Sequence, residues 1–299
     1  MTVTHPGGYP PAELCTLLDR CCATAGLDAR GAVLLRGQTN AVFRLASAPV
    51  LVKIASSGTP VERVRHTVDF TTWLMNQGFP TAPLHAGPEQ PVVLDGRAAT
   101  LWTYLPQPAG PVGAQELALP LRRLHQLQPL APELAALDGI TAIRRSLSRT
   151  RLLPSAVVAE LHAQASRIEA ELADLSYELP RAAVHGDPQH ANALYTPTGV
   201  VLCDWDSAAI GPPEWDLVTV EVHCRRFGYA PAHYRSFAEA YGWDVRDWDG
   251  YPVLRDLREL RMITTNARKA SHAPSTLSEV RRRIEGLRQG DLHGRWSIL

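Results

Sequence analysis

The chain has 299 residues, which is enough for one large domain or for two lobes that share a cleft. It is 45% hydrophobic and 20% charged with a formal net charge of zero, which is typical of a globular protein and excludes extended disorder. This balance gives no overall indication of nucleic-acid binding. The sequence has no apolar run of about eighteen residues and no signal-like N-terminal segment. We therefore expect a cytoplasmic protein with reduced cysteines and with no nucleic-acid or membrane partner.

The first third of the chain is predicted to be rich in β-structure. Apolar residues at helical spacing predict a leading helix within 11–27, with Gly26 as its stop signal. A second helix is predicted over 60–78, between a proline and a glycine. Short β-type stretches surround it, at about 32–37, 41–46, 50–55, 92–95 and 98–105.

A proline-rich stretch at 106–113 divides this part from the remainder, which is mostly helical in pattern. Amphipathic helices are predicted near 114–127, 154–177, 232–241, 251–270 and 275–289. Two short strands are predicted around 192–204. The sequence thus predicts an α+β protein, with a small β-rich N-terminal lobe over 1–105 and a larger helical C-terminal lobe over 106–299.

The segment 184–217 carries the strongest chemical signal, because it places Asp187, Asn192 and Asp204 around the predicted two-strand hairpin. Phosphoryl transfer needs an oriented hydroxyl and cations that neutralise phosphate charge. Mg²⁺ prefers oxygen ligands and commonly takes one or two carboxylates. These residue types therefore suit Mg²⁺-dependent phosphoryl transfer. The alternative is that Asp187 and Asn192 only build a turn and that Asp204 only caps a strand.

The run HGDPQHAN resembles the HGDxxxxN catalytic loop of aminoglycoside phosphotransferases and choline-kinase-like enzymes, and CDWDSAAIGPPEWDL resembles their metal segment. The resemblance implies a two-lobed protein-kinase-like fold. It also implies a kinase that moves the γ-phosphoryl group of ATP or GTP to a hydroxyl of a small molecule. By the same resemblance Asp187 is the catalytic carboxylate, Asn192 and Asp204 bind Mg²⁺, and His185 and Asp216 support the loop.

For two further residues of this segment, the sequence is compatible with two interpretations. His190 and Asp206 lie inside the motif, and each is either a direct participant or a solvated loop residue. A zinc hydrolase is excluded on spacing, because His185 and His190 are five residues apart and no HExxH motif accompanies them.

Lys53 is the candidate for binding the nucleotide phosphates. It lies in the otherwise apolar stretch VLVKIA, where a strand can direct its side chain into a cleft. The alternative is an exposed edge lysine. A partner carboxylate is expected from the following helix, with Glu62 as the first candidate and Asp69 as the second. Many relatives place a glutamate where this chain has His66, so the sequence departs from the family pattern here.

Two further segments are expected to contact the nucleotide. A turn whose amides could approach phosphate oxygens is formed by Gly37, Gln38, Thr39 and Asn40. It resembles the family's nucleotide-covering loop, although an ordinary hairpin turn is the alternative. The resemblance also places the adenine or guanine base against the backbone from Trp102 to Leu105. Trp102 and Tyr104 are core aromatics in the alternative interpretation.

The acceptor is less defined. From Tyr251 to the C-terminus there are ten Arg or Lys residues against five Asp or Glu residues. A basic acceptor region favours a neutral or anionic small molecule, such as a sugar or nucleoside, over a polycationic antibiotic, although an amino alcohol or an antibiotic stays open. These arginines are alternatively solvated helix faces. The alternative function is a non-catalytic kinase-like module that binds a nucleotide or metabolite, but the chain keeps Asp187, Asn192 and Asp204.

Overall fold

A computed structural model describes residues 6–37, 39–128, 134–271 and 273–299. Gln38 of the predicted nucleotide-covering turn therefore lies outside the described residues. The chain forms two compact units: the first comprises Met1–Pro111, Ala131–Leu134 and Asn192–Ala208, and the second comprises Val112–Leu130, Ala135–Ala191 and Ala209–Leu299. The first unit thus takes in the hairpin segment at 192–208 as well as the N-terminal part of the chain.

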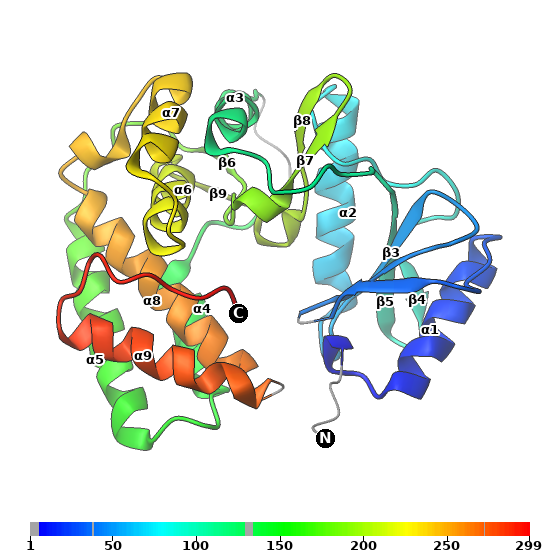
Figure 1. The fold of residues 1–299 in the computed structure, drawn as a ribbon, viewed down its shortest axis with the longest axis horizontal. Helices are drawn as coiled ribbons and strands as arrows, with labels where there is room; N and C mark the ends of the chain where they lie inside the picture. The colour runs from blue at the N-terminus through cyan, green and yellow to red at the C-terminus, as the bar shows by residue number, and fades with distance from the viewer. Residues whose placement is uncertain (1–5, 38, 129–133, 272) are drawn as a thin grey trace. The chain divides into compact units, whose positions relative to one another are not determined.

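The first unit is built on a five-stranded antiparallel sheet with the strand order β1-β2-β3-β5-β4 (Figure 1). Its strands are β1 (Val33–Arg36), β2 (Ala41–Arg44), β3 (Val50–Ile54), β4 (Val92–Leu94) and β5 (Arg97–Thr103). The first four strands lie within the stretches predicted from the sequence, and β5 begins one residue before the predicted 98–105. In β3, Lys53 stands opposite Val42 of β2 and Thr100 of β5, so the lysine occupies the centre of the sheet.

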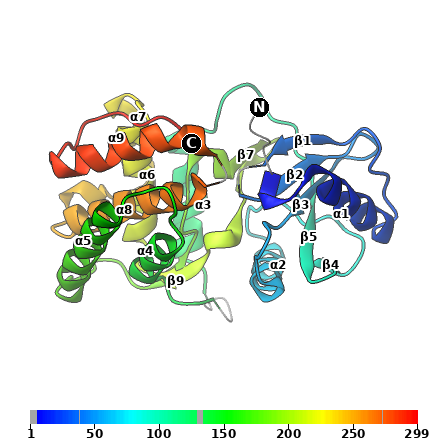
Figure 2. The ribbon, with the colours of Figure 1, turned by 90° about the horizontal axis from the view of Figure 1, so that it is seen from below.

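Two helices accompany this sheet, α1 (Pro11–Thr24) and α2 (Val61–Asn76). Helix α1 begins with a proline at its first position and is followed by Gly26, whose φ of 67° only glycine adopts without strain. It lies against the sheet, as Figure 2 shows, and forms one hydrophobic core with it. The residues of α1 in that core are Leu14, Leu17, Leu18, Cys21 and Cys22.

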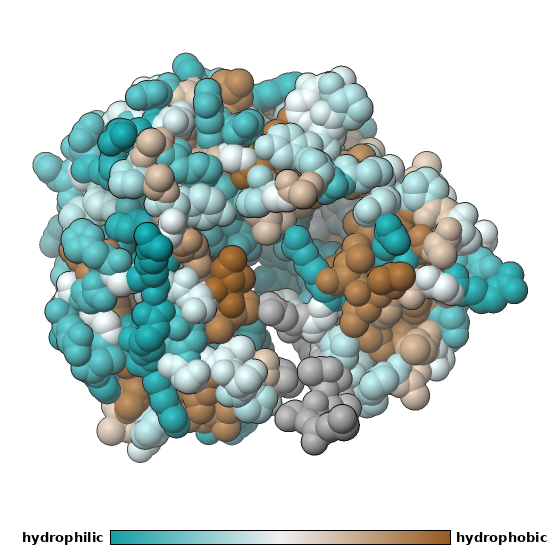
Figure 3. All heavy atoms as spheres, in the orientation of Figure 1, coloured by the Kyte–Doolittle hydropathy of each residue, from teal (hydrophilic) through white to brown (hydrophobic). Residues whose placement is uncertain are grey.

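The edge strand β1 leaves apolar side chains exposed. Val33 and Leu35 are each 47% exposed, and Leu34 on the other face is 41% exposed. Figure 3 shows hydrophobic atoms gathered over the sheet of the first unit. Large apolar side chains that lie together on a surface often mark a binding site.

A second hairpin completes the first unit, with β7 (Ala193–Thr196) and β8 (Gly199–Leu202) in antiparallel register. It is tied to the segment after α2, because the Leu202 amide donates to the Pro80 carbonyl and the Ala82 amide donates to the Leu202 carbonyl. This attachment brings residues 203–208 beside the larger sheet.

The second unit is mainly helical. Its helices are α3 (Ala114–His125), α4 (Gly139–Ser148), α5 (Ser155–Ala173), α6 (Glu214–Arg226), α7 (Pro231–Tyr241), α8 (Tyr251–Lys269) and α9 (Leu277–Arg288). The strands β6 (Ala182–Val184) and β9 (Ala209–Gly211) pair antiparallel among them. Helices α4, α5 and α8 lie side by side in Figures 1 and 2. No helix in the described ranges is long and apolar enough to cross a membrane.

The sequence did not predict α4 or α6. Helix α6 is buried on nearly all of its faces, with twelve buried residues among its thirteen. An amphipathic pattern requires one polar face in contact with water, and α6 has none.

Candidate active site

In the first unit, Lys53 joins two carboxylates from the segment after β8. Its Nζ lies 2.7 Å from Asp204 Oδ1 and 2.8 Å from Asp206 Oδ2. The lysine side chain is only 15% exposed, whereas both aspartates keep more than a third of their surface in contact with solvent. A buried cation is thus held by two carboxylates that a ligand can reach.

These charges set the ionisation of the cluster. Burial alone would lower the pKa of Lys53, but the charges of Asp204 and Asp206 outweigh it and raise this pKa above its usual value. Burial opposes ionisation of Asp206 as well, and Lys53 and a hydrogen bond from Asn40 nevertheless keep the pKa of this carboxyl below its usual value. Lys53 therefore stays protonated and Asp206 stays ionised at neutral pH.

The expected pair between Lys53 and Glu62 is wrong. Glu62 lies in the first turn of α2, is 72% exposed and pairs with Arg65 of the same helix, at 3.4 Å between Oε2 and Nε. The contact of α2 with this cluster comes instead from the next residue, Arg63, and from Thr67, about one turn after it. Arg63 Nη2 donates to the Asp206 carbonyl at 3.2 Å, and Thr67 Oγ1 donates to Asp206 Oδ1 at 3.5 Å. Asp206, which kept two interpretations, is thus a member of the cluster.

The backbone at Asp204 is unusual. Its φ of 66° and ψ of 62° place it in the left-handed region, which residues other than glycine rarely adopt. Such strained conformations concentrate at functional sites. The hairpin also holds Asn192, which is buried and whose carbonyl accepts the Cys203 amide at 2.9 Å. Asp204 and Asn192 offer the oxygen donors that Mg²⁺ prefers, so the donor set fits this ion.

The predicted nucleotide-covering turn is anchored within the first unit. A Cβ added to Gly37 would lie 2.7 Å from Pro6 Cβ, so this position needs glycine, and the Gly37 carbonyl accepts the Gly7 amide. Asn40 is engaged through its side chain, which donates to Asp206 Oδ2 at 2.9 Å and accepts the Ser56 amide at 3.1 Å. Asn40 therefore links the turn to the Lys53 cluster. Thr39, which precedes Asn40 in the same turn, is exposed.

The predicted base-binding segment begins with a buried residue, Trp102, whose Nε1 donates to Thr100 Oγ1 at 2.8 Å. The Tyr104 amide donates to the Pro49 carbonyl at 2.8 Å, and its ring receives the guanidinium of Arg44 at 5.4 Å. Trp102 is thus a core aromatic, whereas Tyr104 is half-buried beside an exposed arginine.

In the second unit, the start of α6 holds the loop 185–187. Asp216 is fully buried and accepts the amides of His185 and Gly186, at 2.7 and 2.8 Å. Trp215 donates from Nε1 to the Gly186 carbonyl at 3.0 Å. Gly186 has a φ of 80°, which lets the loop direct its amide and its carbonyl to these neighbouring residues. The predicted bracing contact of Asp216 is present, and His185 is fully buried within the loop.

Asp187 follows this loop and carries a charged partner that the sequence did not indicate. Arg258 Nη2 of α8 donates to Asp187 Oδ1 at 2.5 Å, and Gln189 Nε2 donates to Asp187 Oδ2 at 3.2 Å. Burial would raise the pKa of Asp187, but the positive charge of Arg258 outweighs it and lowers this pKa to about 2. Asp187 is therefore ionised at neutral pH.

His190 belongs to a buried aromatic group of the second unit. Its ring stacks on Tyr229 with centroids 4.5 Å apart, and its Nε2 lies 2.9 Å from Nε2 of His233. Cys224 Sγ also lies within 4.8 Å of these nitrogens, a combination that could hold a metal ion. However, the Ala114 amide donates to the same nitrogen of His233 at 3.2 Å. The Nε2 atoms of His190 and His233 are thus both engaged in hydrogen bonds within the protein, and a metal ion is not needed to explain their positions.

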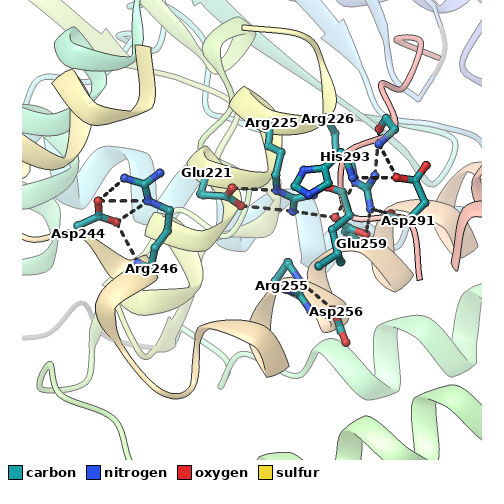
Figure 4. Close-up of polar contacts among 12 residues, drawn as sticks. Glu221, Arg225, Arg226, Asp244, Arg246, Arg255, Asp256, Glu259, Asp291 and His293 are labelled. Atoms are coloured by element: carbon teal, nitrogen blue, oxygen red, sulfur yellow. Dashed lines mark hydrogen bonds and ion pairs between the residues drawn. The ribbon is translucent and has the colours of Figure 1, made fainter. Parts of the chain in front are cut away.

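Several charged residues of the basic C-terminal region are held in ion pairs. Figure 4 shows Arg225 and Arg226 of α6 converging on Glu259 of α8, with Arg226 bound to both carboxylate oxygens at 2.7 and 2.6 Å. Arg255 pairs with Asp256 in the same view. On α9, Arg282 and Arg283 both pair with Glu279. The expectation of a basic acceptor surface from these clusters is therefore weakened, and Arg258 is the arginine of interest.

Comparisons with known proteins identify the family of this chain. The model of a phosphotransferase enzyme family, APH, matches residues 31–257. Protein StrN of Streptomyces griseus is 38% identical over 84 residues, which are 28% of this chain and 25% of StrN. The chain thus spans about a quarter of this curated relative.

Solved structures show the same fold. The choline kinase LicA from Streptococcus pneumoniae has a TM-score of 0.68 at 15% identity, over 93% of this chain and 99% of that chain. The amicoumacin kinase hAmiN, solved with AMP-PNP, Ca²⁺ and Ami, has a TM-score of 0.67 at 15% identity, over 96% and 98%. The predicted α+β, protein-kinase-like fold is confirmed. Because the family model matches most of its length, the chain belongs to the phosphotransferase enzyme family APH.

Proposed function

We propose that this protein is an Mg²⁺-dependent small-molecule kinase that moves the γ-phosphoryl group of ATP or GTP to an acceptor hydroxyl. The observation that carries the proposal is the Lys53 cluster, in which a 15% exposed ammonium is held by two more exposed carboxylates. A fixed cation beside metal-binding oxygens is what the phosphates of a nucleotide require. The strained backbone of Asp204 supports a functional role for this cluster.

Each residue has a distinct task in this proposal. Lys53 binds phosphate oxygens as a cation, and Asp206 keeps its ammonium in place. Asn192 and Asp204 would hold Mg²⁺, which neutralises phosphate charge when bound. Asp187 orients the acceptor hydroxyl and accepts its proton as the new bond to phosphorus forms. Asp216 fixes the loop through its amide contacts, so the position of Asp187 does not depend on the substrate.

The donor is a nucleoside triphosphate. The exposed apolar side chains of β1 supply a surface on which a purine base can lie, close in the sheet to the turn at Gly37. The structural neighbour hAmiN is described with AMP-PNP and Ca²⁺, a nucleotide with a divalent cation.

The acceptor is a neutral or anionic hydroxyl compound such as a sugar or nucleoside. Asp187 is already paired with the buried guanidinium of Arg258, so its charge is compensated within the protein. A polycationic antibiotic would gain little from a carboxylate that is already neutralised. This reason depends on the ion pair of one C-terminal arginine, Arg258, and not on the net charge of the region.

The test is phosphoryl transfer from Mg²⁺-ATP and Mg²⁺-GTP into separate panels of sugars, nucleosides, amino alcohols and aminoglycosides, with products weighed by mass spectrometry. The expected result is the mass gain of one phosphoryl group on a sugar or nucleoside, lost when Mg²⁺ is chelated. Transfer to aminoglycosides alone would overturn the acceptor class. Absence of both nucleotide binding and transfer would overturn the kinase proposal.

A further inference from the structure

We propose that Arg258 of α8 is a positioning residue of the reaction, which holds the carboxylate of Asp187 in a single orientation and in its ionised form. The inference rests on the proposed function for its catalytic consequence. Its structural part, the control of Asp187 by Arg258, can be measured without an acceptor.

The contact itself is short and shielded. Arg258 Nη2 donates to Asp187 Oδ1 at 2.5 Å, and the arginine side chain is only 6% exposed. Hydrogen bonds between charged partners are roughly twice as strong as neutral ones, and burial keeps water from competing for them. A pair at the surface would exchange with solvent, whereas this one fixes the carboxylate.

The guanidinium is supported by the first turn of α6, the helix that holds the catalytic loop. It lies over the ring of Trp215, with Cζ 5.8 Å from the ring centroid. The same tryptophan donates to the carbonyl of Gly186, the residue before Asp187, at 3.0 Å. Arg258 and the loop therefore both contact the same buried side chain, Trp215, at the start of α6. This shared contact keeps the arginine and the carboxylate in a constant relative position.

Arg258 also supplies the positive charge beside Asp187. From α6, His223 contributes Nε2 at 3.4 Å from Arg258 Nη2, and burial followed by the charge of Arg258 lowers the pKa of His223 to about 3. His223 is therefore neutral at pH 7. The loop contributes His185, whose Nδ1 accepts the Asp187 amide at 3.4 Å, and the neutral amide of Gln189. Arg258 on α8 is permanently charged.

This arrangement defines the proton transfer. The acceptor oxygen forms a bond to the γ-phosphorus while the bond from that phosphorus to the β–γ bridging oxygen breaks. The hydroxyl proton passes to Asp187 and then to solvent, and the products are a phosphate ester and a nucleoside diphosphate. Because Arg258 makes the carboxylate a weak base, Asp187 acts mainly by orienting the hydroxyl, and the proton leaves late. Loss of the arginine should therefore affect turnover and not nucleotide binding.

The test compares Arg258→Met and Arg258→Lys with wild type, using Arg255→Met as the matched control. Arg255 lies one turn earlier on α8, and pairs with Asp256 instead of Asp187. The expected result for Arg258→Met is a roughly 10- to 100-fold fall in kcat with nucleotide Kd changed less than about twofold. Arg258→Lys should recover part of the loss, because it restores the charge without the planar fork. Arg255→Met should behave as wild type.

A second readout does not require turnover. The side-chain ¹³C carboxyl signal of Asp187, assigned by its absence in Asp187→Asn, should stay at its ionised position over the pH range in which wild type is folded. In Arg258→Met the same signal should titrate within that range, because burial then acts without the opposing charge. An unchanged titration together with unchanged kcat would overturn the proposal. If wild type neither binds nucleotide nor transfers a phosphoryl group, the kinase proposal fails, and the carboxyl titration alone decides the role of Arg258.

Discussion

Lys53 is fixed by two carboxylates that lie far from it in the sequence, because its Nζ is 2.7 Å from Asp204 Oδ1 and 2.8 Å from Asp206 Oδ2. The apolar run around it predicts a strand, and the alternation of side chains in a strand predicts a lysine that points to one face of the sheet. A partner is expected in the next helix, but the structure places it 151 residues later, at Asp204. A contact between residues so far apart in the sequence produces no short, regular spacing from which it could be predicted. Arg258, 71 residues from Asp187, escaped detection for the same reason.

The revised pairing of Lys53 makes a direct prediction. Lys53→Met should weaken binding of the Mg²⁺-nucleotide by at least about tenfold, because it removes the cation and leaves two carboxylates facing the phosphates. Glu62→Gln should change binding by less than about twofold, because this side chain is 72% exposed and pairs only weakly with Arg65. Titration calorimetry of the two variants measures this difference. A loss of affinity in Glu62→Gln as large as that in Lys53→Met would restore the pairing expected from the sequence.

At the scale of elements, α4 and α6 were both missed, for different reasons. Helix α4 carries a usable signal: Asp138 caps it by accepting the Thr141 amide at 2.8 Å, and Ile140, Ile143 and Leu147 form a buried stripe. Helix α6 carries no such pattern, because water reaches almost none of its surface. Its position at the centre of the helical unit is the reason that it can hold the catalytic loop.

This role of α6 predicts the effect of changing its first turn. Asp216→Asn leaves one acceptor oxygen for two loop amides and presents an NH₂ group to the other amide. The free energy of unfolding should fall by about 2–3 kcal/mol. The value of kcat should fall as well, because the loop is no longer held in place by both of its amides. Asp138→Asn is the matched control, since asparagine caps a helix about as well as aspartate, and it should cost less than about 0.5 kcal/mol. Urea unfolding and steady-state kinetics measure both. Equal stability of the two variants would contradict the bracing role.

At the scale of the molecule, the order of a β-rich part before a helical part was predicted correctly, because periodicity and turn signals are local. The contiguous motif at 185–192 also predicted the candidate loop, since its residues are close in sequence. What a linear division could not predict is that the hairpin segment at 192–208 joins the first unit. The net charge of the C-terminal helices did not reveal their pairing either, because Arg258 and Arg288 meet acidic partners far away in the sequence, Asp187 and Glu160.

Buried neutral histidines predict how the stability of the molecule depends on pH. Burial, followed by the charge of His233, lowers the pKa of His190 to about 4, from the value of 6.5 for an unperturbed histidine. Between these values the unfolded chain binds a proton that the folded chain does not, so stability falls as the pH falls from 6.5 to 4. The shifted pKa of His190 alone should lower the free energy of unfolding by about 2 kcal/mol between pH 6.5 and pH 5. In urea unfolding, His190→Gln should show a shallower dependence over this window, and an unchanged slope would refute the assignment.

The rate of phosphoryl transfer by Asp187→Asn decides whether Asp187 is the catalytic carboxylate. Asparagine keeps the size of the side chain but cannot accept the hydroxyl proton, so kcat should fall roughly 10²- to 10⁴-fold. The Kd for Mg²⁺-nucleotide should stay within about threefold of wild type, because Lys53 and Asp204 belong to a separate unit of the chain. Transfer by Asp187→Asn at a near wild-type rate would contradict the assignment of Asp187 as the catalytic carboxylate.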